Sequence, residues 1–127
     1  VLERHPRLRV ISVESGVGWI PFFLQALDYQ LKDTAPRLEQ KLSLKPSEYF
    51  RRQMAACFWF EQELLVPSIE YLGVDNCLFE TDFPHPTCLY PDPVERALAV
   101  FDGVDDTFRR KVFVANAVRI YNLPTPA

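Results

Sequence analysis

The sequence predicts an α/β fold with a parallel sheet, because strand-like and helix-like segments alternate along the chain. Segments 8–14 and 54–60 are apolar and rich in β-branched or aromatic residues, and a third apolar segment begins at Cys77. Helical patterns follow each of them, in the predicted order β-α-β-α-β-α-α. Alternating βα units of this kind place helices outside a parallel sheet.

The composition indicates one domain with a core of its own. The chain has 127 residues, of which 48% are hydrophobic and 24% charged. A net charge of −3 with scattered basic residues does not favour nucleic-acid binding. No apolar run approaches the roughly 20 residues of a membrane helix, and no signal-peptide pattern is present. The three cysteines show no CxxC spacing, so we expect reduced thiols in a cytoplasmic protein.

The first unit is predicted to run from residue 1 to residue 34. Residues 1–5 fit the last turn of a helix, and a first residue other than Met suggests a fragment or a processed chain. Strand 8–14 leads into a glycine-containing loop, and Pro21 lies near the start of the next helix. In that helix the spacing of Phe23, Leu27 and Leu31 predicts one buried face.

The second unit is predicted to span residues 35–73. A polar connection with a possible short helix leads to a turn that opens at Pro46, with Ser47 as its N-cap. The apolar run 54–60 fits a strand by length and aromatic content, although periodicity alone does not exclude a helix. A short helix then ends at Gly73.

The third unit is predicted to span residues 74–123, with a frayed tail at 124–127. Residues 92–95 resemble a capping box at a helix start, and Asp105 is expected to cap the next helix. Asn116 is expected to interrupt that helix and recap a final turn.

The most informative stretch lies between the second and third units. Residues 77–86 begin as a buried strand and end in a loop that carries Asp82 and His85 between prolines. In α/β folds, the carboxyl end of a strand is where chemistry usually takes place.

Carboxylates are predicted to gather at this edge of the sheet. By strand alternation, Asp82 and Glu80 share the inward side of the third strand, and Glu14 shares the inward side of the first strand with Ser12 and Val10. Such a group cannot stay fully ionised in a low-dielectric mouth without a metal ion, an arginine or a shared proton.

Each candidate also has a purely structural interpretation. Asp82 fits a turn aspartate, Glu14 fits an ordinary strand-end residue, and His85 fits a loop histidine bonded to backbone. A Cys88–His85 nucleophile lacks any visible oxyanion motif. Pattern alone leaves these alternatives open.

Four stretches carry a resemblance to a known family. Residues 5–10, 14–21, 78–85 and 116–121 read HPRLRV, ESGVGWIP, LFETDFPH and NAVRIY. In this order they resemble the C-terminal part of the amidohydrolase-related ("amidohydrolase 2") family, which includes aminocarboxymuconate-semialdehyde decarboxylase. The resemblance implies about three βα units, strands six to eight, of a TIM (β/α)8 barrel, for which the complete fold needs about 250 residues.

The resemblance also implies roles for individual residues. Asp82 matches the family's strand-eight aspartate, a metal ligand that serves as a base in hydrolytic members. Glu14 stands where many relatives have a histidine acting as acid or base, and Glu80 replaces a small residue inside the pocket. His85 matches a histidine that supports the ligand or faces substrate.

Substrate and metal follow from the same resemblance. It implies a divalent ion, Zn²⁺ as first expectation, and a hydrolase or decarboxylase reaction on a small carboxylated or cyclic substrate. Trp19 and Phe83 are expected to line the pocket. No nucleic-acid or membrane partner is expected.

Part of the family's metal site has no counterpart in this sequence. The family uses a His-x-His on strand one and a histidine on strand five, whereas this chain has 2 histidines, neither in those places. Whether the chain by itself is an enzyme therefore stays open. The alternatives are a catalytically incomplete fragment, and a non-enzymatic α/β module that forms homo-oligomers through exposed strand edges or binds a ligand without metal.

Overall fold

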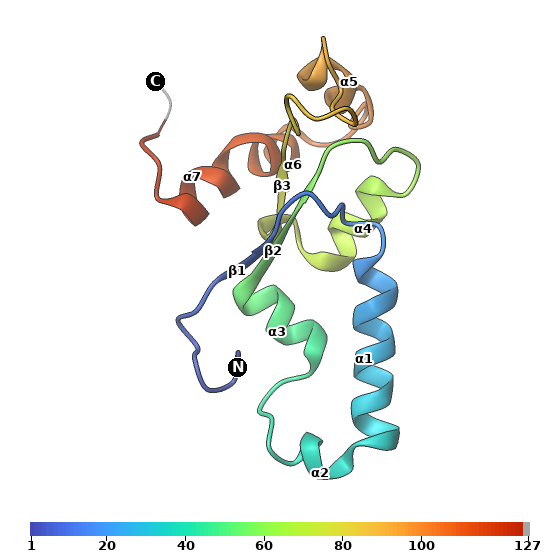
Figure 1. Ribbon diagram of the computed structural model, residues 1–127, viewed down its shortest axis with the longest axis vertical. Helices are drawn as coiled ribbons and strands as arrows, with labels where there is room; N and C mark the ends of the chain where they lie inside the picture. Colours follow the sequence, from blue (N-terminus) through green and yellow to red (C-terminus); the bar gives the residue numbers. More distant parts are fainter. Residues whose placement is uncertain (126–127) are drawn as a thin grey trace.

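Three parallel strands form one sheet in the computed structural model, which describes residues 1–125 (Figure 1). The strands are β1 (Val10–Ser12), β2 (Met54–Phe58) and β3 (Cys77–Phe79), with β2 in the middle. Both pairings are parallel. The predicted α/β fold with a parallel sheet is confirmed, and the strands are shorter than predicted.

Helices connect and follow the strands. Between β1 and β2 lie α1 (Ile20–Thr34), α2 (Pro36–Glu39) and α3 (Pro46–Gln53). Between β2 and β3 lie α4 (Leu65–Leu72) and the 3₁₀ turn η1 (Val74–Asn76). After β3 come α5 (Pro93–Ala99), α6 (Asp106–Arg110), the π-helical segment η2 (Lys111–Ala115) and α7 (Asn116–Tyr121).

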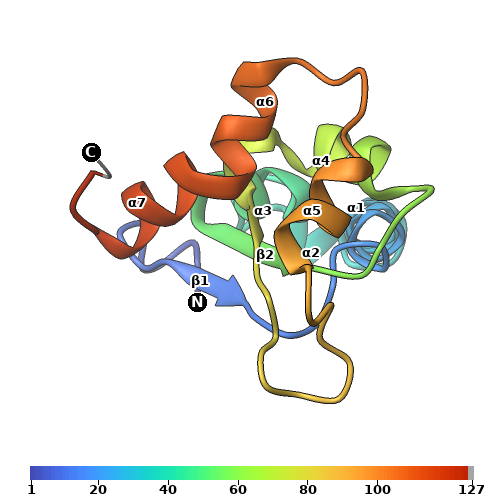
Figure 2. The same ribbon diagram turned by 90° about the horizontal axis from the view of Figure 1, so that it is seen from above.

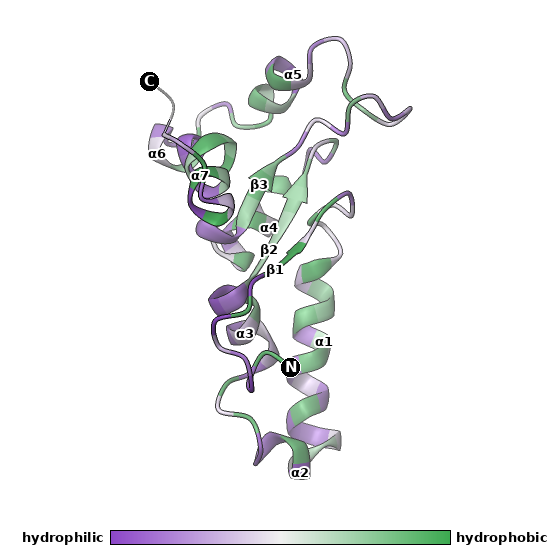
Figure 3. Cartoon of the chain, turned by 60° about the vertical axis from the view of Figure 1, so that its left-hand side comes forward, coloured by the Kyte–Doolittle hydropathy of each residue, from purple (hydrophilic) through white to green (hydrophobic). Residues whose placement is uncertain are grey.

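The larger core lies on one face of the sheet. Phe58 of β2 is fully buried there, and its ring centroid lies 5.9 Å from that of Phe79, 5.8 Å from Phe101 and 6.1 Å from Phe113. Residues from α1, α3 and α4 complete this core. The strands are hydrophobic in Figure 3, as expected for parallel strands covered by helices.

A smaller cluster covers the opposite face. It contains Ala55, Cys57 and Leu78, and Ala117 and Ile120 of α7 pack against it. The chain therefore crosses from one side of the sheet to the other through the continuous run α6–η2–α7, which Figure 2 shows in orange and red.

Asn116 anchors this run instead of capping a helix, so the predicted interruption at this residue is wrong. Its side chain is buried, and the amide donates to the carbonyl oxygens of Val74 (2.7 Å) and Cys77 (2.8 Å). The helix stays continuous through a π-helical segment, which the weak apolar periodicity did not reveal.

The predicted sides of the first strand are wrong. Ile11 packs with the smaller cluster, and Ser12 lies in register with Ala56, which belongs to the larger core. Val10 and Ser12 therefore face the helix-covered side. By alternation Glu14 would point the same way, so its approach to the inward side needs a local change of backbone.

Other local predictions have mixed outcomes. Asp105 caps α6 by accepting from the N–H of Phe108, as predicted. Lys45, not Ser47, is the N-cap of α3, and the Asp92 side chain makes no cap hydrogen bond at the start of α5. Residues 2–4 form a turn instead of a helix end.

Two further predictions concern the ends and the environment of the chain. The predicted tail extends past the described part, since residues 126 and 127 lie outside it. Among the residues described, no helix has the length and apolar character needed to span a bilayer.

Candidate active site

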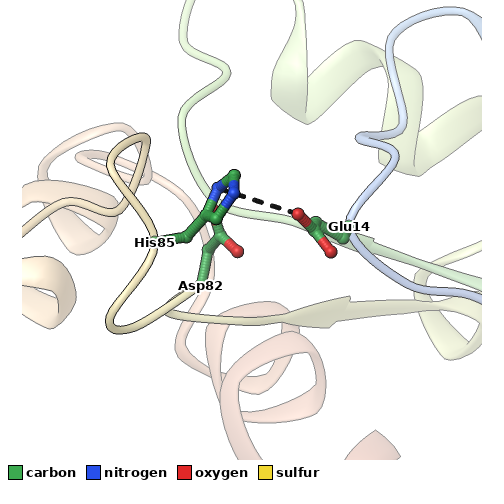
Figure 4. A group of neighbouring side chains, drawn as sticks. All are labelled: Glu14, Asp82 and His85. Carbon is green, nitrogen blue, oxygen red and sulfur yellow. Dashed lines mark ion pairs between the residues drawn. The ribbon is translucent and has the colours of Figure 1, made fainter.

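The loops that follow β1 and β3 meet beyond the carboxyl end of β2. Glu14 comes from the first loop, and Asp82 and His85 come from the second (Figure 4). One potential ligand atom from each of the three side chains lies within 4.8 Å of the other two. The predicted juxtaposition of these residues is present in the fold.

Left-handed backbone turns aim both carboxylates. Glu14 has φ 55° and Asp82 has φ 56°. Non-glycine residues rarely adopt this region, and holding one there costs of order 1–3 kcal/mol. At Glu14 the break reverses the strand alternation and brings the side chain to the inward side.

His85 stands between the two carboxylates. Its Nδ1 atom lies 3.4 Å from Asp82 Oδ2 and 3.7 Å from Glu14 Oε1. The Asp82 side chain is only 8% exposed, whereas those of His85 and Glu14 are each 56% exposed. Asp82 is therefore the shielded member of the group, and the other two face the open side.

A hydrogen-bonded loop holds Asp82 in place. The Thr87 hydroxyl donates to Asp82 Oδ2 at 2.6 Å, and the N–H of His85 donates to the Asp82 carbonyl oxygen at 2.8 Å. The indole N–H of Trp59, on the segment that leaves β2, donates to the Thr87 carbonyl oxygen at 3.2 Å. The loop is thus tied to the middle strand of the sheet.

Glu80 lies below this group and links the two loops. Its Oε1 accepts from the N–H of Glu14 at 2.9 Å, and the Cys57 thiol donates to its carboxylate. Burial raises the pKa of Glu80, and the Asp82 and Glu14 charges raise it further against the opposing effect of the Glu14 N–H. Burial also raises the pKa of Cys57 to about 12, so this cysteine is a neutral thiol donor and not a nucleophile.

Glu61 shapes the loop that carries Glu14. Its Oε1 accepts from the N–H of Val17 at 2.6 Å and lies 2.5 Å from where a Cβ on Gly16 would stand. Gly16 also has φ +68°. The glycine is needed here for both backbone conformation and close approach.

The site opens into a cavity of about 510 Å³. Residues of both loops line it: Val13, Glu14, Glu80, Thr81, Asp82, Phe83, Pro84, His85 and Pro86. Phe83 and Glu80 thus stand at the pocket as the sequence analysis expected. Trp19 does not, since it lines an apolar cavity of about 320 Å³ between the N-terminal segment, α1 and α3.

Three supporting residues were missed from the sequence. Thr87 and Trp59 hold the Asp82 loop, and Glu61 holds the Glu14 loop. A hydroxyl two residues after His85 is the only one of these signals near the singled-out stretch. Trp59 and Glu61 act from another strand, which local spacing does not reveal.

Comparison with known proteins identifies the family. A family model described as amidohydrolase matches residues 1–123. The chain belongs to the amidohydrolase family. None of the curated proteins compared with it gives a match.

Solved structures resemble this amidohydrolase chain over nearly its whole length. A 5-carboxyvanillate decarboxylase from Sphingomonas paucimobilis has 32% identity and a TM-score of 0.74, with 97% of this chain and 36% of that chain covered. An amidohydrolase from Mycobacterium avium subsp. paratuberculosis K-10 has 29% identity and a TM-score of 0.75, with coverage of 94% and 29%.

A more distant structure shows the fold alone. It is a dihydroxybenzoic acid decarboxylase from Polaromonas sp. JS666, solved with bound manganese and the inhibitor 2-nitroresorcinol, at 19% identity and a TM-score of 0.67. It is covered to 36% of its length. The amidohydrolase chain thus spans about a third of the length of these structures.

The residues present fit a divalent cation. Carboxylate oxygens and an imidazole nitrogen are donors that such ions accept in proteins. Among the described residues, His85 is the one positively ionisable side chain that pairs with Glu14 or Asp82, and the Lys and Arg ion pairs lie elsewhere. Asp82 is held by Thr87 in the way that ligating carboxylates are commonly oriented by hydrogen bonds.

Proposed function

We propose that this chain supplies one part of the active site of a metal-dependent decarboxylase that acts on small aromatic carboxylates. The meeting of Glu14, Asp82 and His85 at the carboxyl edge of a parallel sheet is the observation that carries the proposal. The likeness to the 5-carboxyvanillate decarboxylase supports decarboxylation over hydrolysis.

In the complete protein, the three strands would be strands six to eight of a (β/α)8 barrel. The chain spans about a third of the solved structures that it matches. In the described part, β1 and β3 each pair on one side only, so the sheet can continue past both. Closure of a barrel removes such edges.

Asp82 would hold the metal ion, which polarises the substrate and stabilises negative charge that develops on it. Zinc is the expectation from the family resemblance, and manganese is the alternative because the Polaromonas enzyme binds it. Oxygen donors suit manganese well. Further ligands would come from elsewhere in the complete site.

The other two residues would handle the substrate and its proton. In decarboxylation, the bond between the ring carbon and the carboxylate breaks, carbon dioxide leaves, and the ring carbon takes up one proton. Glu14 and His85 are both half-exposed at the cavity, so either reaches a bound substrate. Phe83, at 67% exposure, offers an aromatic surface against which a ring can pack.

The test is carbon dioxide release from 5-carboxyvanillate and 2,6-dihydroxybenzoate by the full protein that contains this chain, loaded with Zn²⁺ or Mn²⁺. Asp82→Asn should lower kcat at least 100-fold, in line with loss of a metal ligand or its support. Asp92→Asn makes the same change in the same loop, where the side chain makes no cap hydrogen bond. It should keep wild-type activity. Full activity in Asp82→Asn would refute the proposal.

A second candidate function rests on the edge of β1. Leu8, Val10 and Val13 are 41%, 37% and 53% exposed on or beside this strand. We infer that a chain without barrel partners associates through this edge as a homo-oligomer. Sedimentation of the 127-residue chain tests it, and a monomer at all concentrations would exclude the association.

A further inference from the structure

The Nδ1 atom of His85 is surrounded by hydrogen-bond acceptors. It lies 3.1 Å from the Thr87 hydroxyl oxygen, 3.4 Å from Asp82 Oδ2 and 3.7 Å from Glu14 Oε1. The contact to Thr87 is within ordinary hydrogen-bond distance, whereas the two carboxylates stand beyond it.

The Thr87 hydroxyl has one proton, and Asp82 takes it. The hydroxyl oxygen lies 2.6 Å from Asp82 Oδ2, and an ionised carboxylate only accepts hydrogen bonds. The hydroxyl is therefore left with lone pairs toward His85. For the 3.1 Å contact to be a hydrogen bond, Nδ1 has to donate.

We propose that Thr87 is a positioning residue that holds neutral His85 in its Nδ1–H form and leaves Nε2 as the only acceptor of the ring. None of the side-chain hydrogen bonds within residues 1–125 involves Nε2. Because the ring is half-exposed and lines the cavity, this lone pair is open to a proton on a substrate. The use of that acceptor on a substrate rests on the proposed function, whereas the tautomer does not.

The backbone of the loop is held separately from the hydroxyl. Trp59 donates to the carbonyl oxygen of Thr87, and the N–H of Cys88 donates to the carbonyl oxygen of His85 at 3.0 Å. A change of the Thr87 side chain leaves both bonds available. Thr87→Val removes the hydroxyl and keeps the branched shape, and Thr87→Ser keeps the hydroxyl.

The experiment is a long-range ¹H–¹⁵N NMR correlation of the imidazole rings in the metal-free chain, at alkaline pH where they are neutral. The chain has 2 histidines, so His5→Gln assigns the spectrum and His5 serves as an internal reference. In wild type and Thr87→Ser, His85 should show a protonated Nδ1 and an unprotonated Nε2. In Thr87→Val it should move to Nε2–H, the form that predominates in free neutral histidine.

Two results would overturn the assignment. A wild-type spectrum with Nε2–H would show that the loop does not set the tautomer. An unchanged Nδ1–H spectrum in Thr87→Val would show that the carboxylates set it without the hydroxyl. The Trp59 indole N–H resonance should match wild type in both variants, which confirms that the loop stays in place. None of these outcomes depends on decarboxylase activity, so the inference and the proposed function fail separately.

Discussion

The main-chain N–H of Glu14 donates to the Glu80 carboxylate over 2.9 Å, which joins the loop after β1 to the end of β3 across the middle strand. The bond fixes the loop that carries Glu14, but it places a second carboxylate under the site. Burial together with the nearby Asp82 charge raises the pKa of Glu80. This relationship sets a pH dependence of stability.

The contribution of Glu80 to stability should fall as pH rises. Because the pKa of Glu80 is higher in the folded than in the unfolded chain, the folded state binds more protons between the two values. This contribution is present below the ordinary glutamate pKa and is lost as pH rises through the raised pKa. Urea unfolding at a series of pH values above the ordinary glutamate pKa measures the slope.

Glu80→Gln should remove that slope and make the chain more stable at neutral pH. The amide oxygen still accepts from Glu14, while the charge next to Asp82 is gone. The matched control is Glu70→Gln on the exposed side of α4, which should leave the slope as in wild type. Equal slopes for wild type and Glu80→Gln would contradict the prediction.

Gly16→Ala should destabilise the chain by about 1–3 kcal/mol, because it forces an L residue into a left-handed conformation. The backbone has φ +68°, and the new Cβ would stand 2.5 Å from Glu61 Oε1. Gly18→Ala in the same loop is the control, since a Cβ there meets nothing within 4 Å. Chemical denaturation of both variants gives the difference, and equal effects would show that the Gly16 loop has no such constraint.

Asn116→Ala should cost about 2–4 kcal/mol of unfolding free energy, because it leaves two buried carbonyl groups without a donor. These are the carbonyl oxygens of Val74 and Cys77 at the start of β3. Asn122→Gly should be close to neutral, since Asn122 already has the left-handed φ of 53° at the end of α7. A loss below about 0.5 kcal/mol in Asn116→Ala would mean that water replaces the amide there.

Local patterns were enough to predict most of the elements. The alternation of strands and helices predicted the parallel sheet, and the Asp105 cap is as expected. These features depend on residues close together in the chain. The orientation of β1 was wrong because it depended on counting alternation back from Glu14, whose left-handed φ interrupts that alternation.

The candidate site could be predicted only in part. Asp82 and His85 were recognisable because they follow a buried strand, and Glu14 because it ends the first one. Thr87 was not, since its role depends on loop geometry that folds it back toward Asp82. Glu61 and Trp59 reach both site loops from the segment after β2, a tertiary relationship that no spacing in the sequence encodes.

Added Mn²⁺ or Zn²⁺ should stabilise the wild-type chain and not Asp82→Asn. An ion that binds only the folded state raises the unfolding free energy by about 2.7 kcal/mol at a free concentration of 100 times its Kd. Glu14, Asp82 and His85 offer donors within 4.8 Å, and Asp82 is the most shielded of them. Thermal unfolding with increasing metal should therefore show a rising midpoint for wild type and for Asp92→Asn. Because Cys88 is a partly accessible free thiol, Cys88→Ser should keep the effect if the carboxylates bind the ion. A rise in midpoint that survives Asp82→Asn but disappears with Cys88→Ser would place the ion on the thiol and exclude Asp82 as its ligand.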